Sequence, residues 1–412
     1  DLDLIGYPRL VRLNPATPWK TRGNGSLVMR FGRGAGGSIE VGEIGGRRIF
    51  CRTFQKGPEP DARELISRIA PLVEERREED SDPGLVVSVR KPSQSLYWLG
   101  VRTILGRGTV ERELESIGAL RFELGCGRGI IGASCGMAWR PRDRTYELLA
   151  YRPEDRWGTL RVFDPESIRE VDAKHHTTFN SWEERGRKVA MVPSTPCPVM
   201  YGLRGDDPQE LAVAAREIRT EPLDRWMIFL TNQGTDDHII RGFSEMVPNR
   251  SYYIEGVSLS RSRHIPGGHV LMDLATAHGG VTCAAYEPSK EFRMLFDRLI
   301  PGDRIGVMGE LREEPRTLNV EKVRVISLAE DIRKVANPSC PVCGRRMDSI
   351  GSGKGYRCRP CRTRSDSPVT ERFARWVAPG WYEPPTAARR HLSKPLKRMG
   401  LEQPLEFVNS RN

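Results

Sequence analysis

In the first third of the chain, some segments have the short apolar runs of strands, and others have the three-to-four-residue apolar spacing of helices. Short apolar runs predict strands at 4–13, 26–31, 47–54 and 84–89. Behind Asp61, a residue suited to cap a helix, apolar residues recur every three to four positions. They predict one apolar helix face, made of Leu65, Ile66, Ile69, Leu72 and Val73. A second helix is expected at 110–117 and a glycine-rich turn at 32–37.

These elements predict an α/β domain at residues 1–118. The chain begins directly in a strand, at Asp1, and without Met. We therefore expect that the N-terminus, including the first strand of this domain, is missing.

Residues 119–222 follow a different order of elements. The pattern predicts a strand at 146–151, a helix at 165–172, strands at 188–192 and 198–203, and a helix at 208–219. Strand, helix, strand, strand, helix is most of a ferredoxin-like unit. A ferredoxin-like domain is therefore expected here.

Residues 223–330 give the clearest fold pattern. Three strands are predicted at 251–260, 269–275 and 280–286, then a helix at 289–299, then strands at 304–310 and 318–328. This is the order of an OB-fold, a small barrel that binds oligonucleotides. The alternative is a small β-barrel that binds no nucleic acid.

The chain has 412 residues, enough for about two to four domains. Its net charge of +11 and its pI of about 9.3 indicate a polyanionic partner. From residue 338 onward, fifteen Lys and Arg stand against six Asp and Glu, so most of the charge lies in this last segment. No apolar run reaches the ~18 residues of a membrane span, and no signal peptide is visible. A soluble, cytoplasmic protein without a membrane partner is expected.

Four of the nine cysteines form two Cys-x-x-Cys pairs, Cys340 with Cys343 and Cys358 with Cys361. Two such pairs can supply four thiolates to a tetrahedral structural Zn²⁺ site. The spacing therefore predicts a zinc ribbon in a C-terminal unit at residues 331–412.

Cations surround this ribbon and continue into the tail, where Trp376, Trp381 and Tyr382 lie among them. Aromatic residues among cations are typical of RNA contacts. The alternative is a solvated tail that docks through its tryptophans. The candidate RNA-binding residues are Arg345, Arg346, Arg357, Arg389, Arg390, Lys394, Lys397 and Arg398.

The segment 18–25 is a candidate phosphate site. Lys20 and Arg22 can hold a polyphosphate, Lys as a point charge and Arg as a fork. Gly23 and Gly25, on either side of Asn24, allow a tight turn whose N–H groups approach a ligand. The alternative is a surface β-hairpin with Asn24-Gly25 as its type I′ turn.

Two further segments could serve the same chemistry. Lys91 and Ser93 lie in a second basic turn. The segment 125–134 places Arg128, Gly129 and Gly132 in a glycine-rich loop that enters a helix, where an anion or ribose could bind. The alternative for this loop is close helix–sheet packing without a ligand.

Taken together, the chain resembles the archaeal tRNA-isoleucine 2-agmatinylcytidine synthases, or agmatidine synthases, over essentially its whole length. Each matching motif is modest, but their order and spacing are specific. The motifs lie at 9–15 and 20–25, 127–133, 143–147, 196–198, 202–205 and 225–236, and they include the four paired cysteines.

The resemblance implies a kinase-like domain at 1–118, before the ferredoxin-like domain, the OB-fold and the zinc ribbon. It implies that agmatine is joined to C2 of the wobble cytidine of a CAU-anticodon isoleucine tRNA, with ATP, Mg²⁺ and structural Zn²⁺. The family's acidic Gly-Ile-Asp-Asp-Thr-Asp-Ser motif is not among the 412 residues, and its role is not assigned to Asp1 or Asp3.

The resemblance directs the candidate residues to three roles. Lys20 and Arg22 are the candidate catalytic residues. An agmatine pocket or domain interface is expected at Arg128, Gly129 and Gly132. The ATP-binding candidates are Lys20, Thr21, Arg22, Gly23, Asn24, Lys91 and Ser93.

A carboxylate is also needed for the agmatine guanidinium. The pairs at 206–207 and 236–237 are candidates, although Asp207 before Pro208 favours a helix cap. The competing hypothesis for the whole chain is a non-catalytic RNA-binding protein built from the OB-fold and the ribbon.

Overall fold

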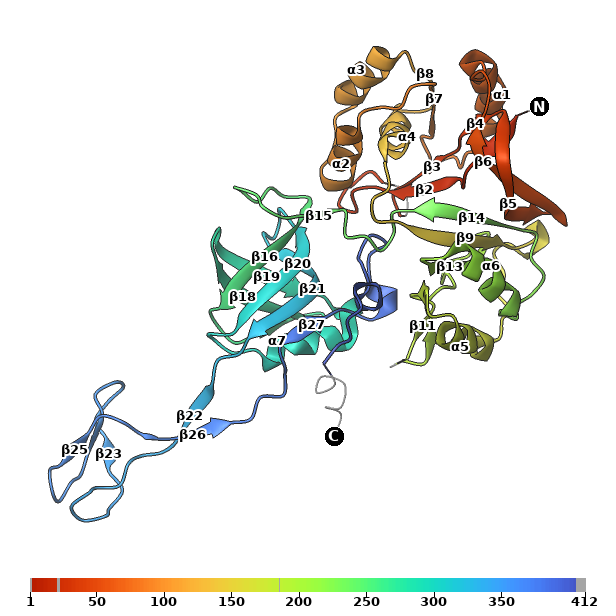
Figure 1. The fold of residues 1–412 in the computed structure, drawn as a ribbon. Coiled ribbons are helices and arrows are strands. Elements are labelled where there is room, and N and C mark those ends of the chain that lie inside the picture. Colours follow the sequence, from red (N-terminus) through yellow and green to blue (C-terminus); the bar gives the residue numbers. More distant parts are fainter. Residues whose placement is uncertain (1, 21–22, 185, 405–412) are drawn as a thin grey trace.

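The computed structural model describes residues 2–20, 23–184 and 186–404 (Figure 1). A large sheet with helices on it, a β-barrel and a small ribbon unit follow one another along the chain. The blue C-terminal segment returns to the middle of the molecule, between the barrel and the large sheet (Figure 1). No helix in the described residues is long and apolar enough to cross a membrane.

The large sheet has ten strands, and its main path runs β10-β13-β9-β14-β5-β6-β1-β4, with β2 and β3 attached through β14. Its first six strands come from the N-terminal segment and its last four from the next. The strands are β1 (Asp3–Ile5), β2 (Arg9–Arg12), β3 (Gly25–Val28), β4 (Phe31–Gly32), β5 (Gly34–Ile44), β6 (Arg47–Gln55), β9 (Thr145–Tyr151), β10 (Thr178–Phe179), β13 (Val199–Gly205) and β14 (Arg225–Thr231).

In the described residues, six α-helices, the short 3-10 helix η1 (Glu154–Arg156) and two small sheets accompany the large sheet. In the first domain, α4 packs against α2, α3 and strand β7, around a core that includes Trp139 and Tyr97. The elements are α1 (Ala62–Glu75), α2 (Gln94–Arg102), α3 (Arg107–Ile117), α4 (Gly129–Ala138), α5 (Pro165–Lys174), α6 (Pro208–Glu217), the pair β7 (Gly84–Val87) and β8 (Leu120–Glu123), and the pair β11 (Trp182–Glu183) and β12 (Lys188–Val189).

Strand β14 joins the first two units. It pairs with β9 along all seven residues, from Arg225 to Thr231, and also with β5 and with β2. The expected start of the barrel domain at residue 223 therefore differs from the structure, in which this strand lies in the middle of the large sheet. The reason is that a strand's partners depend on tertiary contacts, which its own sequence does not specify.

The glycine-rich segment expected to be a turn is mostly strand β5. It pairs with β6, and its register shifts between Ala35 and Ser38, as at a β-bulge. A Cβ atom at Gly36, whose φ is +80°, would lie 2.2 Å from the Thr53 hydroxyl oxygen. The glycines therefore allow an irregular strand rather than a chain reversal. Helix α2 was also not expected from the sequence.

The barrel confirms the predicted order of elements. Strand β16 pairs with both β18 and β20, and this closes the ring β16-β20-β21-β19-β18. The predicted single helix is two short ones, separated within η2 by Lys290 at φ 51°. The elements are β15 (Ile239–Ile240), β16 (Arg250–Ser258), β17 (Arg263–Ile265), β18 (His269–Thr276), β19 (Gly279–Ala285), η2 (Glu287–Met294), α7 (Leu295–Arg298), β20 (Arg304–Leu311) and β21 (Leu318–Ser327).

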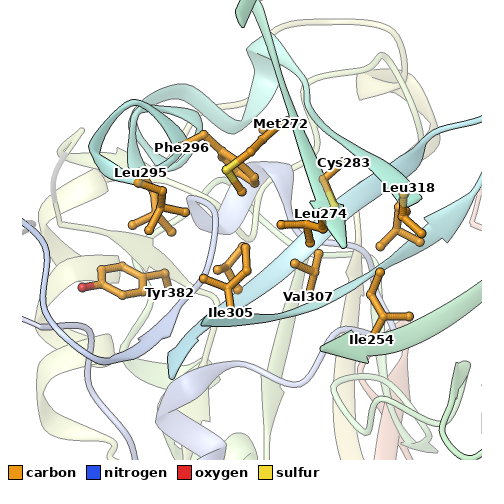
Figure 2. Close-up of a cluster of buried hydrophobic side chains, with 14 of the residues drawn as sticks. Ile254, Met272, Leu274, Cys283, Leu295, Phe296, Ile305, Val307, Leu318 and Tyr382 are labelled. Carbon is orange, nitrogen blue, oxygen red and sulfur yellow. The ribbon is translucent and has the colours of Figure 1, made fainter. Parts of the chain in front are cut away.

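Two residues of the barrel core, Val377 and Tyr382, come from the tail. Strand β27 (Gly380–Tyr382) pairs with β21 and places Tyr382 among the buried side chains, with its hydroxyl donating to the Ala378 carbonyl (Figure 2). The labelled core side chains are Ile254, Met272, Leu274, Cys283, Leu295, Phe296, Ile305, Val307, Leu318 and Tyr382. The tail is therefore part of the barrel, and not only of the ribbon unit.

The ribbon is an insertion into the edge of the barrel. Strand β22 (Asp331–Ala336) leads out of the barrel and β26 (Val369–Phe373) leads back beside it. Between them, β23 (Asp348–Ser349), β24 (Tyr356–Arg357) and β25 (Arg364–Ser365) form a three-stranded sheet. The ribbon extends away from the rest of the molecule (Figure 1).

Phe296→Ala is expected to destabilise the barrel by about 3–5 kcal/mol, because it opens a cavity in a fully buried core. Pulse proteolysis in urea, following cleavage within 250–330, measures this. The control Met294→Ala removes a side chain that is 42% exposed, and should change stability by about 0.5 kcal/mol or less. Equal effects of the two substitutions would contradict the packing described here.

Candidate functional site

The turn around Lys20 belongs to a long loop. Strands β2 and β3 pair with Arg12 opposite Gly25, so the loop spans 13–24 and is not a two-residue hairpin with an Asn24-Gly25 turn. Asn24, at φ 38°, donates from its side chain to the Asn14 carbonyl (2.8 Å) and closes the loop. Thr21 and Arg22, two of the expected phosphate ligands, lie outside the described residues.

Lys20 lies on the inner side of this loop. Its ammonium donates to the carbonyl oxygens of Pro15 (2.6 Å) and Thr17 (3.4 Å). Burial lowers the pKa of Lys20, and the positive charge of Arg390 lowers it further. The loop therefore lies close to the C-terminal tail, which sequence reasoning had not placed there.

A cavity of about 230 Å³ lies between the loop and the tail. Among the described residues that line it, none is acidic and five are basic: Arg12, Lys20, Arg389, Arg390 and His391. Gly23, at φ +84°, borders it, and its carbonyl accepts from Arg12 (3.3 Å). The arrangement suits an anion, as the residue types around Lys20 predicted.

We call residues 386–400 the C-terminal strap; it contains η3 (Thr386–Ala388) and η4 (Leu396–Met399). Its backbone pairs with the segment after β14: the Gly234 N–H donates to the His391 carbonyl and the Asp236 N–H to the Leu392 carbonyl, both at 2.8 Å. The side chain of Leu392 is buried in the core of the first domain. The strap is thus docked against the body of the protein.

The strap's cations are largely used inside the protein. Arg389 pairs with Glu383 (2.9 Å) and donates to Asn180. Lys394 pairs with Asp143 (2.8 Å). Lys397 is exposed. Of the two tail tryptophans in the docking alternative, Trp376 is 70% exposed, whereas Trp381 lies against Tyr253 and Arg324 of the barrel.

Two strap arginines bridge domains. Arg390 pairs with Glu310 and Glu321 of the barrel, and Arg398 pairs with Asp143 and Asp206 of the second unit (both 2.8 Å). Burial raises the pKa of Glu321, but the positive charge of Arg390 and the contact with His238 outweigh it and bring the pKa down to about 2. These pairs hold the barrel and the large sheet on the same segment.

The four Asp candidates for the agmatine guanidinium are engaged as well. Asp207 caps α6, as its position before Pro208 predicted. Asp206 pairs with Arg398, and Asp236 with Lys322 (3.0 Å). Asp237 accepts from the hydroxyl of Tyr97 (2.5 Å).

A buried carboxylate next to the cavity was not singled out from the sequence. Glu147 pairs with Arg204 (2.9 Å) and, more loosely, with Arg12 (3.8 Å). Although burial raises the pKa of Glu147, the charges of Arg204 and Arg12 lower it below its usual range. Glu147 ends the matching motif at 143–147, but no role was predicted for it, and its position in strand β9 is what brings it to the site.

The structure does not bring Lys91 to Lys20. Lys91 lines a separate cavity of about 270 Å³ with Arg9 and Arg30, among strands β3 and β7 and helix α1. Burial lowers the pKa of Lys91, and these two cations lower it further. Ser93 caps helix α2, where its hydroxyl accepts from the Ser95 N–H (3.4 Å).

The glycine-rich segment before α4 packs closely. A Cβ atom at Gly129 would lie 2.1 Å from the Gly84 nitrogen, so helix and strand touch backbone to backbone. Gly132 faces Leu13 at ordinary contact distance. Arg128 stacks on Trp19, 4.4 Å from the ring centre, and connects this segment to the Lys20 loop.

The four cysteines form the expected metal-binding cluster. In the described part of the chain, Cys340, Cys343, Cys358 and Cys361 are the only group of three or more close potential ligands, with their sulfur atoms within 4.8 Å of one another. Burial raises the pKa of Cys340, but the N–H groups of Cys343 and Val342 outweigh it and lower the pKa to about 6. This sulfur set fits Zn²⁺, which would tie the two knuckles together.

Cys358→Ser is expected to release the zinc, because it removes one of four thiolate ligands. Metal analysis of the purified chain should find one zinc per chain before the substitution and almost none after it. Cys126→Ser, which changes an exposed cysteine outside the cluster, is the control and should keep the metal. Unchanged zinc in the Cys358 variant would refute the ribbon.

Comparison with known proteins agrees with this arrangement. Three domain families match: the TiaS TCKD domain over residues 1–126, the TiaS FLD domain over 127–238 and the TiaS C-terminal zinc ribbon domain over 337–377. The tRNA 2-agmatinylcytidine synthetase TiaS of Archaeoglobus fulgidus, which acts on an isoleucine tRNA, is 38% identical over 410 residues, covering 97% of this chain and 90% of the relative. That of Methanocaldococcus jannaschii is 33% identical, covering 96% and 91%.

Solved structures agree as well. A crystal structure of TiaS in complex with its isoleucine tRNA and ATP matches with a TM-score of 0.82 and 35% identity, over 97% of this chain and 90% of that chain. A complex of TiaS with the same kind of tRNA, AMPCPP and agmatine matches with a TM-score of 0.80 and 32% identity, over 98% and 91%. The resemblance noted in the sequence is confirmed, and the chain belongs to the TiaS family of isoleucine-tRNA 2-agmatinylcytidine synthetases.

Proposed function

We propose that the protein joins agmatine to C2 of the wobble cytidine in a CAU-anticodon isoleucine tRNA, at the expense of ATP. The observation that carries this is identity of 32–38% to TiaS proteins over about nine tenths of their length, including structures with isoleucine tRNA, ATP and agmatine. Because those relatives are synthetases, the non-catalytic RNA-binding alternative is not favoured.

The reaction follows from the chemistry of the pyrimidine. The C2 oxygen of cytidine is a poor leaving group, and transfer of a phosphoryl group from ATP makes it a good one. The agmatine amine then forms the N–C2 bond, the C2–O bond breaks, and inorganic phosphate leaves with the electron pair as the amine loses a proton. The base must leave its stack to reach the site.

We place the ATP phosphates at the cavity beside Lys20, with Gly23, Asn24 and the undescribed Thr21 and Arg22. What supports this is the basic lining of that cavity and its position between the first domain and the strap. Lys91 and Ser93 lie at the other cavity, so a direct role for them there has less support.

Agmatine is assigned to the region of Arg128, Gly129 and Gly132, which reaches the Lys20 loop through Trp19. Close packing of Gly129 against Gly84 favours the domain-interface role for this glycine. Arg128 itself is exposed and could contact a ligand.

The domain types are part of the proposal. We assign a kinase-like fold to 1–118, a ferredoxin-like fold to the unit expected at 119–222, which β14 extends to residue 231, and an OB-fold to the barrel that follows β14 within the segment 223–330. The succession β9, α5, β13, α6, β14 supports the second, and the closed barrel with its helices between β19 and β20 supports the third.

Mg²⁺ is expected for phosphoryl transfer; apart from the four cysteines, the described residues offer no group of three or more close potential metal ligands, so no residue is assigned to this ion. No step is therefore derived through this ion. For the tRNA, the ribbon arginines Arg345 and Arg346 are exposed and Arg357 is half-buried, so they can reach phosphate.

The direct test is nucleoside mass spectrometry. A CAU-anticodon isoleucine tRNA transcript incubated with the protein, ATP, Mg²⁺ and agmatine should yield agmatidine after digestion. Omitting agmatine or ATP gives the blank. tRNA binding in a gel shift without product would mean that this chain docks the tRNA but does not modify it.

Lys20→Ala should abolish ATP turnover and leave tRNA binding within a few-fold, because it removes the cation assigned to the ATP phosphates. Radiolabelled ATP measures turnover and a gel shift measures binding. Lys56→Ala, on an exposed lysine outside the cavity, should change neither. Loss of tRNA binding together with turnover would contradict the assignment of Lys20 to ATP.

A further inference from the structure

The strap covers only one part of the barrel's outer face. Side chains alternate along β21, so Lys322 and Arg324 both face outward, on either side of the core residue Val323. Lys322 is fully buried, because the strap lies over it and its ammonium donates to the Lys394 carbonyl. Arg324, two residues further along the same strand, is exposed. The part of the face around Arg324 is therefore open.

Two aromatic rings lie on this open part. The ring centroids of Tyr253, on β16, and Trp381, on β27, are 6.2 Å apart, and the ring planes differ by 34°. Between them, Gly306 of β20 has no side chain, and a Cβ atom there would lie 2.4 Å from the Tyr253 hydroxyl oxygen. Both rings are half-buried. The glycine thus makes room for Tyr253 above the sheet, and the two rings share one surface.

An arginine accompanies each ring. The guanidinium carbon of Arg241 lies 4.5 Å from the centre of the Tyr253 ring, and that of Arg324 lies 5.9 Å from the centre of the Trp381 ring. Both arginines are exposed, and neither forms an ion pair with any described residue. Arg324 is also the register partner of Trp381, so these groups are placed by the sheet itself. We call Tyr253, Trp381, Arg241 and Arg324 the aromatic platform.

The charge of this surface is positive. The nearby Glu255 carboxylate accepts from the Tyr253 hydroxyl (2.9 Å) and pairs with Arg304 (2.9 Å). Arg241 and Arg324 therefore keep charges that suit an anionic partner. Aromatic rings and guanidinium planes are the groups on which unpaired nucleobases stack, whereas the bases of duplex RNA are already stacked on one another.

The aromatic platform lies on the same face as the contact between the barrel and the basic cavity. Arg390, which lines the cavity, pairs with Glu310 of β20, and Gly306 lies four residues before Glu310 on that strand. At about 3.3 Å per residue, the two positions are about 13 Å apart. If the wobble cytidine reacts at the cavity, an unpaired nucleotide close to it in the anticodon loop can reach the platform.

We propose that an unpaired base of the tRNA anticodon loop stacks on the aromatic platform. This inference rests on the proposed function, which brings the wobble cytidine to the basic cavity. It gives the two parts of the barrel's outer face different roles. The part under the strap holds the domains together, and the open part holds the substrate.

The test measures binding of the anticodon stem-loop RNA of the CAU-anticodon isoleucine tRNA by fluorescence anisotropy, with the whole chain. Trp381→Ala should raise the Kd about 5- to 150-fold, the range for the loss of one base stack. Trp381→Phe, which keeps a ring, should recover most of the affinity. Trp157→Ala changes a 43% exposed tryptophan of the second unit, and the Kd should stay within two-fold. Thermal unfolding shows whether each variant remains folded.

Abasic substitutions test whether the contact is with a base. Each unpaired nucleotide of the loop is made abasic in turn. One position should weaken binding to the wild-type chain, and at that position Trp381→Ala should cause little further loss, because both changes remove the same stack.

Arg241→Lys separates stacking from charge. The ammonium keeps the positive charge but has no planar face. The Kd for the stem-loop should therefore rise a few-fold while its salt dependence stays the same.

Three results would overturn the inference: no binding of the stem-loop by the wild-type chain, wild-type affinity for Trp381→Ala, or a loss for Trp381→Ala that is the same whichever base is removed. If the wild-type chain forms no agmatidine but its binding of the stem-loop depends on Trp381 and on one base, the proposed function fails and the platform stands. If agmatidine forms and Trp381→Ala binds as the wild-type chain does, only the platform is refuted.

Discussion

The arrangement of the domains depends on charges buried where they meet. Lys322, on strand β21, is fully buried and is held by Asp236 and by the Lys394 carbonyl (2.6 Å). An ammonium taken out of water without partners costs several kcal/mol. The partners of Lys322 come from the segment after β14 and from the strap. The buried charge is therefore compensated only when both segments are in place. A buried ion pair adds little net stability, because the cost of desolvation offsets much of the Coulombic attraction, whereas removal of one partner leaves a buried charge uncompensated.

The domains are joined to one another in two different ways. The first two units share one sheet through β14, so they are joined by backbone hydrogen bonds. The barrel is joined to them through side-chain charges, among them Glu310, Glu321 and Lys322. The basic cavity lies where the two kinds of connection meet, so its two walls come from chain segments that are far apart in the sequence.

The sequence predicted those parts of the molecule that are specified locally. The cysteine spacing predicted the metal cluster. The order of strands in the barrel was predicted correctly because apolar and polar residues alternate within each strand. Strand β5 was missed because glycines usually mark turns, while here they allow a bulge against Thr53 and its neighbours. The sequence indicated the Lys20 loop as a site, but not the strap residues 389–392 on the other side of the cavity. The partners of Arg390 and Arg398 are at least 69 residues away along the chain, at positions such as Glu321 and Asp143, and no local pattern connects them.

Because the ribbon is inserted into the barrel and the strap follows it, the strap leaves the ribosome after the large sheet and the barrel strands β16 to β21. Until then, Glu321 lacks Arg390 and Lys322 lacks the Lys394 carbonyl, so water solvates the two charges. Their burial therefore comes late in synthesis. Docking of the strap therefore completes the assembly of these domains. A nascent chain interrupted within the ribbon holds the barrel strands β16 to β21, but only the Lys20 side of the basic cavity.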